Sequence, residues 1–186
     1  MKFTFQPLTA DTWKDFVELF GENGACGGCW CMAWRFNAAD YNKNKGAGNK
    51  KAIHQLVRKN LPIGLLAYAN KEPVGWCAVS PRSEYKRLES SKVLRPVDEE
   101  PVWSVSCFFI RKDYRNKGLS TALLKAVISY SKKNGASIVE GYPYDVKTKT
   151  SDVFVWTGLS SSFLKAGFEE VDRRSETRPI MRYYIN

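Results

Sequence analysis

The stretch CFFIRKDYRNKGLSTALL (Cys107–Leu124) decides the expected fold. A run of apolar residues typical of a buried strand leads into a basic turn, RNKGLS (Arg115–Ser120), and this turn opens a helix with a strong apolar face. The first N–H groups of a helix have no partner within it, and the helix dipole makes that end positive. Gly118 lets the backbone approach an anion closely, while Arg115 and Lys117 add positive charge. The pattern predicts a strand, turn and helix that bind a pyrophosphate; the alternative is a polar helix start with one tolerated glycine.

The segments on either side predict an α/β protein. The expected strands are a hairpin at 63–79, then 102–110, 137–143, 168–174 and 180–185; the expected helices are 9–20, 50–60, 118–135 and 158–166. Residues 42–48 resemble a mobile basic loop, and the polar connection 80–101 is either functional or contains a short helix. The order of strands and helices after the hairpin predicts helices on the faces of one sheet.

Length and composition predict a single domain spanning residues 1–186. The chain has 44% hydrophobic and 26% charged residues, which is an ordinary globular balance. Its apolar runs are too short to span a bilayer, and its N-terminal residues lack the apolar core of a signal peptide. We therefore expect a cytoplasmic protein, without a membrane partner, whose five cysteines are reduced thiols.

The net charge of +10 suggests an anionic partner, either nucleic acid or a ligand that carries phosphates. Positive charge is densest in Asn42–Lys59 and in Arg173–Arg182. Neither segment has the interleaved aromatic residues of a surface that stacks bases, so nucleic-acid binding ranks second.

The central stretch resembles the acetyl-CoA-binding motif of the GNAT superfamily of N-acyltransferases, in which an apolar strand leads to Arg/Gln-x-x-Gly-x-Gly/Ala and a helix with a Leu-Leu pair. Ser120 stands where that motif has Gly or Ala, and Lys112 where it often has proline. The resemblance extends to the hairpin, to SIVEGYP, to FLKAGFEEV and to a cysteine-rich CWCM-x-WR segment near the N-terminus. The motif positions in this chain are Phe108 and Ile110 in the strand, Arg115, Gly118, and Leu123 with Leu124 in the helix.

The resemblance implies a mixed, mostly antiparallel sheet of about seven strands with helices on both faces. It implies transfer of an acetyl group from acetyl-CoA to a primary amine of a small molecule or peptide, by direct attack. We expect a monomer or homodimer, and no metal. A gap between Cys107–Ile110 and Ile138–Tyr142 would admit the pantetheine arm, and an amide near Phe109 or Ile110 would polarise the thioester. The implied acetyl-CoA-binding residues are Phe108, Phe109, Ile110, Arg115, Asn116, Lys117, Gly118, Leu119 and Ser120.

The family's general acid is missing from its usual place. A tyrosine often stands four residues before the Gly-Phe pair, where this chain has Phe163, and an asparagine seven residues earlier is here Trp156. Tyr142, Tyr144 or Ser160–Ser162 are substitutes, although a tyrosine at a strand end is more often a packing residue. An acyl-CoA-binding sensor without catalysis is therefore the alternative function.

Glu140 is the candidate base. A carboxylate in the apolar strand IVEGY is costly to bury unless it is paired or functional. It could deprotonate the acceptor ammonium through water, or it could form an ion pair with one of the 29 basic side chains. The sequence alone does not decide between a catalytic base and a buried ion pair.

Cys26, Cys29 and Cys31 form a Cys-x-x-Cys-x-Cys motif with three readings. Structural zinc needs a fourth ligand at fixed spacing, which the motif lacks, and a redox role needs a low thiol pKa that sequence does not show. The third reading is the wall of an acceptor pocket, with simple core packing as its alternative. The expected acceptor-binding residues in this region are Trp30, Met32, Trp34 and Arg35.

Overall fold

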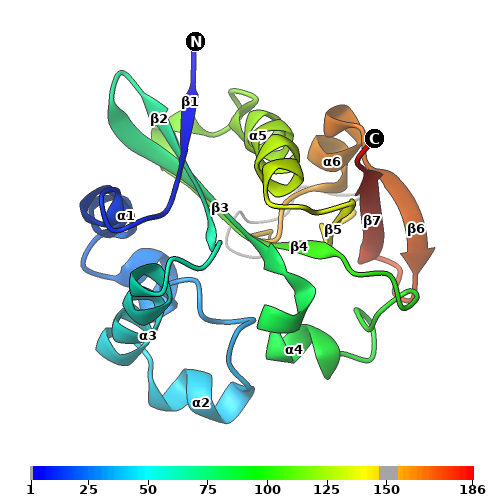
Figure 1. Ribbon diagram of the computed structural model, residues 1–186, viewed down its shortest axis with the longest axis horizontal. Helices are drawn as coiled ribbons and strands as arrows, with labels where there is room; N and C mark the ends of the chain where they lie inside the picture. Colours follow the sequence, from blue (N-terminus) through cyan, green and yellow to red (C-terminus); the bar gives the residue numbers. More distant parts are fainter. Residues whose placement is uncertain (1, 147–154) are drawn as a thin grey trace.

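A computed structural model of the chain describes residues 2–146 and 155–186. Its strands form one seven-stranded sheet in the order β1-β2-β3-β4-β5-β7-β6 (Figure 1). Neighbouring strands are antiparallel except for β4 and β5, which are parallel. The expectation of a mixed, mostly antiparallel sheet of about seven strands is confirmed. The strands are β1 (Thr4–Pro7), β2 (Gly64–Ala69), β3 (Glu72–Pro81), β4 (Trp103–Ile110), β5 (Ile138–Gly141), β6 (Glu169–Arg173) and β7 (Pro179–Tyr184).

Helices cover both faces of this sheet, as expected. In Figure 1, α1 and α3 lie on one side of β2 and β3, and α5 lies on the other. Three short helical turns, η1 (Gly24–Gly28), η2 (Arg82–Glu84) and η3 (Lys112–Tyr114), stand in the connections. The helices are α1 (Trp13–Phe20), α2 (Ala38–Lys43), α3 (Ala47–Arg58), α4 (Lys86–Glu89), α5 (Leu119–Lys133) and α6 (Ser160–Ala166).

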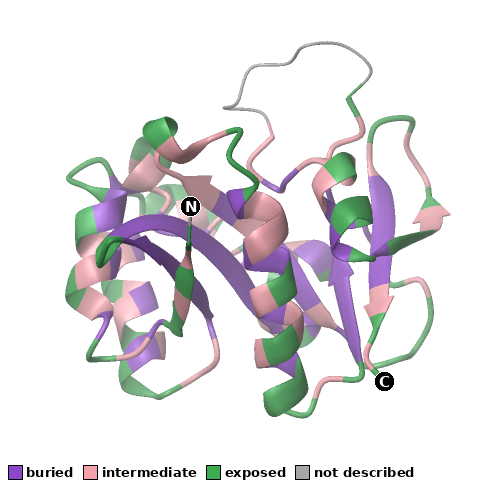
Figure 2. Cartoon of the chain, turned by 90° about the horizontal axis from the view of Figure 1, so that it is seen from above, coloured by how far each residue is buried: buried purple, intermediate pink, exposed green. Residues whose placement is uncertain are grey.

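Strand alternation divides the interior into two main cores. Leu65 and Ala67 of β2 pack toward α5, whereas Leu66 and Tyr68 pack toward α1 and α3, because successive side chains of a strand point to opposite faces. Figure 2 shows the central strands as buried along most of their length. A strand buried on both faces explains why the hairpin reads as continuous apolar runs.

Two connections differ from a simple loop. The prediction of a mobile loop at 42–48 is wrong, because this range contains the end of α2 and the start of α3. The side chain of Asn37 caps α2 by accepting a hydrogen bond from the amide of Asp40 at 2.8 Å. The connection 80–101 contains η2 and α4, so the short helix, one of the two alternatives for this connection, is present.

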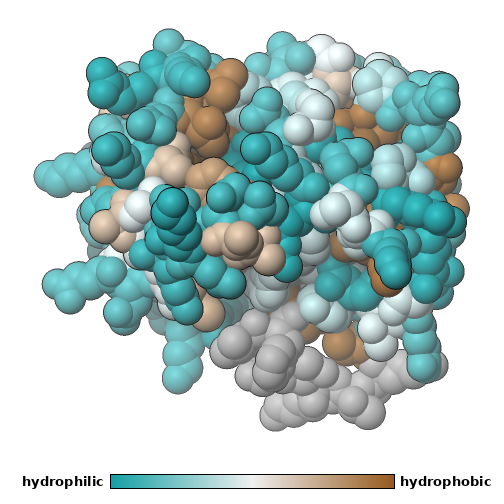
Figure 3. Space-filling model, turned by 90° about the horizontal axis from the view of Figure 1, so that it is seen from below, coloured by the Kyte–Doolittle hydropathy of each residue, from teal (hydrophilic) through white to brown (hydrophobic). Residues whose placement is uncertain are grey.

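Hydrophilic residues cover most of the face shown in Figure 3, apart from the part drawn in grey, and hydrophobic residues appear there in small separate groups. Within the described residues, no helix combines the length and the apolar character needed to cross a bilayer.

Candidate active site

The strands β4 and β5 separate soon after they meet. They pair only from Trp103–Val105 to Val139–Gly141, whereas β4 continues to Ile110. A register shift at Ala78 and Val79 of the neighbouring β3 leaves Ser106 as an extra residue in β4. The expected gap beside β4 is therefore present, and it begins at this bulge.

Backbone groups of β4 face the gap at alternating residues. The amide of Phe108 donates to the carbonyl of Trp156 at 2.7 Å, and the carbonyl of Ile110 accepts from Arg115 Nε at 3.1 Å. The amide of Arg111 instead donates to Val74 on the β3 side, at 3.0 Å. The alternation places the Ile110 amide on the gap edge and the Phe109 amide on the ladder with β3.

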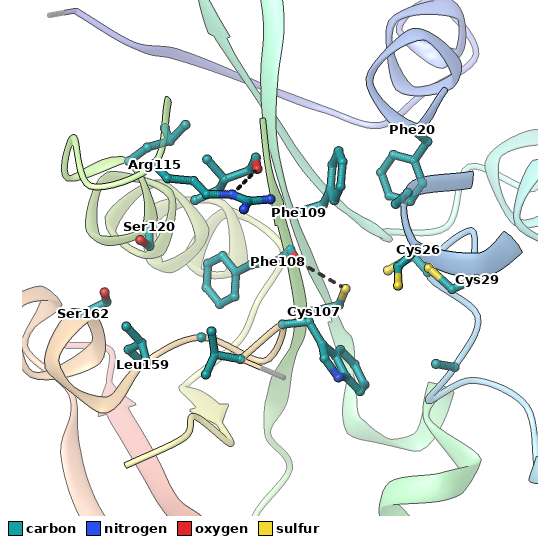
Figure 4. A pocket seen from close by; sticks show the side chains of 18 of the residues that line it. Phe20, Cys26, Cys29, Cys107, Phe108, Phe109, Arg115, Ser120, Leu159 and Ser162 are labelled. Carbon is teal, nitrogen blue, oxygen red and sulfur yellow. Dashed lines mark hydrogen bonds between the residues drawn. The ribbon is translucent and has the colours of Figure 1, made fainter. Parts of the chain in front are cut away.

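A cavity of about 570 Å³ follows this open edge of β4 (Figure 4). One end is formed by the turn before α5 and by the start of that helix, through Tyr114, Arg115, Asn116, Leu119 and Ser120. The middle is formed by Cys107–Ile110 and by residues 155–159 and Ser162 of the facing segment. The far end is formed by the segment after α1 and by α4, and its lining includes Cys26, Cys29, Cys31, Trp34, Tyr41 and Arg87.

The start of α5 has the form expected of an anion site. Gly118 adopts a left-handed φ of 76°, and a Cβ there would meet no atom within 4 Å, so backbone conformation rather than crowding requires glycine. The first bond along the helix runs from the amide of Ala122 to the carbonyl of Gly118, which leaves the amides of 119–121 without a helical partner. Lys117 and Gly118 flank the cavity but do not line it, whereas the other expected acetyl-CoA-binding residues do.

Four of the five cysteines line the cavity: Cys26, Cys29 and Cys31 at its far end, and Cys107 of β4 next to them. Figure 4 shows Cys26 and Cys29 side by side on the segment after α1, with Cys107 of β4 facing them. Burial raises the pKa of Cys29. The neighbouring Cys107 thiol and a 3.2 Å hydrogen bond from Trp76 Nε1 lower the pKa of Cys31 despite its burial, and the proximity of the two thiols raises the pKa of Cys107.

The four expected acceptor-binding residues lie in different parts of the structure. Trp34 lines the cavity, but Trp30 and Met32 are buried in the core against α1 and α3. Arg35 is 5% exposed; its guanidinium donates to Ser80, pairs with Glu84 at 3.5 Å and stacks on the Tyr85 ring. Of the four, only Trp34 is placed where it can touch a ligand in this cavity.

Glu140 lies in a buried ionic network outside the cavity. It is 0% exposed and accepts hydrogen bonds from Arg82 Nη1 at 3.2 Å and from Arg182 Nε at 2.8 Å. The Tyr142 hydroxyl donates to it at 2.6 Å and also bonds to Ser104. The ion pair, which was the alternative reading of Glu140, is the arrangement that the structure shows.

The two tyrosines that were candidates for the general acid pack against other residues and do not line the cavity. Tyr142 is fully buried, and burial raises its pKa well above the usual range. Tyr144 lies beneath the Arg178 guanidinium, 4.1 Å from ring centre to Cζ, and does not line the cavity. Ser162 is the residue of the Ser160–Ser162 group that lines it.

Phe163 fills the space where the family pattern has a tyrosine. Its ring is 0% exposed and packs edge-on against Phe108 and Phe168. A Cβ at Gly141 would lie 2.1 Å from this ring, and one at Gly158 would lie 2.9 Å from it. Both glycines therefore accommodate an aromatic ring that is sealed from solvent.

No group of three or more His, Cys, Asp or Glu side chains in the described residues is arranged to hold a metal ion.

Tyr41, Arg87 and Cys107 line the cavity but were not among the expected acceptor residues. The sequence carried little signal for them, because they come from α2, α4 and β4, which are far apart in the chain.

Comparisons with known proteins give a consistent family assignment. The family model described as Acetyltransferase (GNAT) family matches residues 30–142. An uncharacterized N-acetyltransferase of Methanocaldococcus jannaschii is 24% identical over 174 residues. That match covers 90% of this chain and 61% of the relative, so the chain spans less than two thirds of the relative's length.

Solved structures show the same fold at low identity. The PaiA N-acetyltransferase of Thermoplasma acidophilum in complex with coenzyme A aligns over 100% of both chains, with a TM-score of 0.55 and 16% identity. The aminoglycoside acetyltransferase AAC(6')-Ib, also in complex with coenzyme A, covers 98% of this chain and 95% of its own, with a TM-score of 0.53 and 17% identity.

Proposed function

The chain belongs to the acetyltransferase (GNAT) family, and from this premise we propose that it transfers an acetyl group from acetyl-CoA to a primary amine of a small molecule or peptide. The observation that supports this most is the single cavity that joins the start of α5 to the open edge of β4. The helix amides of 119–121, which have no helical partner, and the positive charge of Arg115 suit a pyrophosphate, and the adjoining edge suits an extended thioester arm.

The β4 edge supplies the proposed electrostatic contribution to catalysis. The Ile110 amide, rather than that of Phe109, faces the gap and is the donor that we assign to the thioester oxygen. One donor of this kind typically contributes about 3 kcal/mol to stabilising the oxyanion. The amine nitrogen attacks the thioester carbon, the C–S bond breaks, and the CoA thiolate leaves with the amide as the other product.

Proton transfer in this proposal uses groups other than carboxylates. The described lining of the cavity contains no aspartate or glutamate. The thiols of Cys31 and Cys107 line the cavity and are titratable side chains next to its far end. We assign the loss of the ammonium proton, and the proton that the leaving thiolate gains, to solvent.

Two measurements test the proposed function. Calorimetric titration with acetyl-CoA should show saturable binding, and ligand at 100 times its Kd should stabilise the fold by about 2.7 kcal/mol. An amine panel followed by release of free CoA thiol then separates an enzyme from an acyl-CoA sensor. Binding without release with any amine would favour the sensor, for which the buried Phe163 is the supporting observation, and absence of binding would exclude both.

A further inference from the structure

The charges around the cavity restrict the acceptor. The charged side chains in its described lining are Arg87, at the far end, and Arg115, at the α5 end, and both are positive. The far end is otherwise aromatic and thiol-lined, with Trp34 and Tyr41 beside Arg87. A positive, apolar wall repels polycations and attracts a molecule with one negative group and an apolar body.

Arg87 is held in place without an acidic partner among the described residues. Its Nη1 donates to the carbonyl of Ala33 at 3.1 Å, and its guanidinium carbon lies 5.7 Å from the centre of the Trp34 ring. The amide of Arg87 also donates to the carbonyl of Trp34 at 3.1 Å. These contacts orient the guanidinium at the cavity wall and use only one of its N–H donors among the described residues. The planar guanidinium can therefore donate two parallel hydrogen bonds to a carboxylate.

The indole of Trp34 lies beside Arg87. Its Nε1 is buried and has no hydrogen-bond partner within the described residues, so other atoms of the residue line the cavity. Trp34 also packs 5.6 Å from the Trp156 ring, so the guanidinium of Arg87 stands next to an aromatic surface.

We propose that the acceptor is an amine that also carries a carboxylate next to an apolar or aromatic group, and that Arg87 binds this carboxylate. The proposal rests on the proposed function, because it assigns the far end of the cavity to the acceptor. It disfavours aminoglycosides and polyamines, whose several ammonium groups find no acid in the described lining.

Matched amines test the acceptor class. L-phenylalanine, L-phenylalaninamide and phenethylamine share the aromatic group and the amine, and only the first has a carboxylate. We expect kcat/KM for CoA release to be about 10- to 100-fold higher with L-phenylalanine than with the other two, because charged hydrogen bonds contribute about 1.5–3 kcal/mol. Equal rates with the three amines, or a higher rate with spermidine, would overturn the proposal.

Arg87→Gln tests the assigned residue. It should abolish the preference for L-phenylalanine, while the Kd for acetyl-CoA measured by calorimetry stays unchanged. Lys86→Gln is the matched control, because it removes the same charge from the exposed neighbour on α4 and should preserve the preference. A preference that survives in Arg87→Gln would contradict the role of Arg87.

A binding measurement covers the case in which none of these amines is turned over. With CoA bound, 3-phenylpropionate should quench tryptophan fluorescence of the wild type at concentrations at least about tenfold lower than 3-phenylpropanamide does. Arg87→Gln should remove that difference, and Lys86→Gln should keep it. If the wild type binds 3-phenylpropionate and 3-phenylpropanamide equally well, the carboxylate site is overturned. The proposed function is tested separately, by CoA binding, and can still hold in that case.

Discussion

Arg82 and Arg87 belong to the same short connection but have opposite surroundings. Arg82 is 7% exposed, and its guanidinium donates to Glu89, Glu140 and Tyr142 and to two backbone carbonyls. Arg87 has one backbone carbonyl and the face of an indole. The same side chain is therefore fully satisfied at one position and partly satisfied at the other.

The difference separates the part of the molecule that holds the fold from the part that is open to a ligand. Around Arg82, a buried network joins the connection after β3 to β5 and β7 through Glu140 and Arg182. Around Arg87, the same connection forms a wall of the cavity. Burial and complete pairing indicate a structural residue, whereas partial pairing at a cavity indicates a binding residue.

The largest expected effect is at Glu140. Glu140→Gln leaves Arg82 and Arg182 facing each other without the buried negative charge, and we expect a loss of about 3–5 kcal/mol in the free energy of unfolding. Urea unfolding measures it. The control Glu99→Gln changes an exposed neighbour of the network and should stay within about 0.5 kcal/mol of the wild type. A stable Glu140→Gln protein with greatly reduced turnover would return Glu140 to the role of base.

Phe163→Tyr should have the next largest effect. The added hydroxyl enters a sealed aromatic cluster, and a buried hydroxyl without a partner costs about 1–3 kcal/mol. Urea unfolding and the rate of CoA release measure the two consequences. We expect lower stability and no gain in rate; a faster enzyme would show that this position still reaches the leaving thiolate.

Asp98 links the network to pH. The hydrogen bonds from Arg182 hold the pKa of Asp98 below its usual 3.8. A lowered folded pKa contributes stability above the usual value, and this contribution is lost as the pH falls through the folded pKa. Because Asp98 is exposed, the effect should be below about 1 kcal/mol. Asp98→Asn should be less stable than the wild type near pH 6 and should match it at the lowest pH that both tolerate.

The smallest expected change in stability is at Arg87. Arg87→Gln loses one hydrogen bond to Ala33 and a stack on Trp34, and it should stay within about 0.5 kcal/mol of the wild type. Arg82→Gln should lose several times more, because it leaves buried acceptors unpaired. Similar losses at the two positions would show that the contrast in pairing does not separate structure from binding.

The fold was predictable because its signals are local. The turn at Arg115–Ser120 and the apolar face of α5 lie within one stretch of sequence, and the hairpin reverses at Asn70 and Lys71, which adopt left-handed φ angles of 50° and 70°. Even the missed helix α2 had a local signal, because Asn37 followed by Asp40 is a capping pattern.

The far end of the cavity was less predictable because its residues are brought together only by the fold. Glu140 pairs with Arg82 and Arg182, which lie on other elements, so an unusual carboxylate in a strand could not be assigned to structure or catalysis. Trp30 and Trp34 are close in sequence, yet one packs in the core and the other lines the cavity. Short, irregular segments lack the periodicity that shows which side chains face inward.

The segment that carries Cys26 and Cys29 is shaped by its backbone. The amide of Gly28 donates to Asn23, and its carbonyl accepts from Gly46 and from Asn49 Nδ2. A Cβ on Gly28 would lie 2.6 Å from the Gly46 nitrogen, so close chain approach shapes the path, and the Cys29 thiol adds a 3.4 Å hydrogen bond to the carbonyl of Gly24. The path of this loop should therefore tolerate exchange of the exposed Cys26 thiol, whereas a side chain at Gly28 would require Gly46 to move.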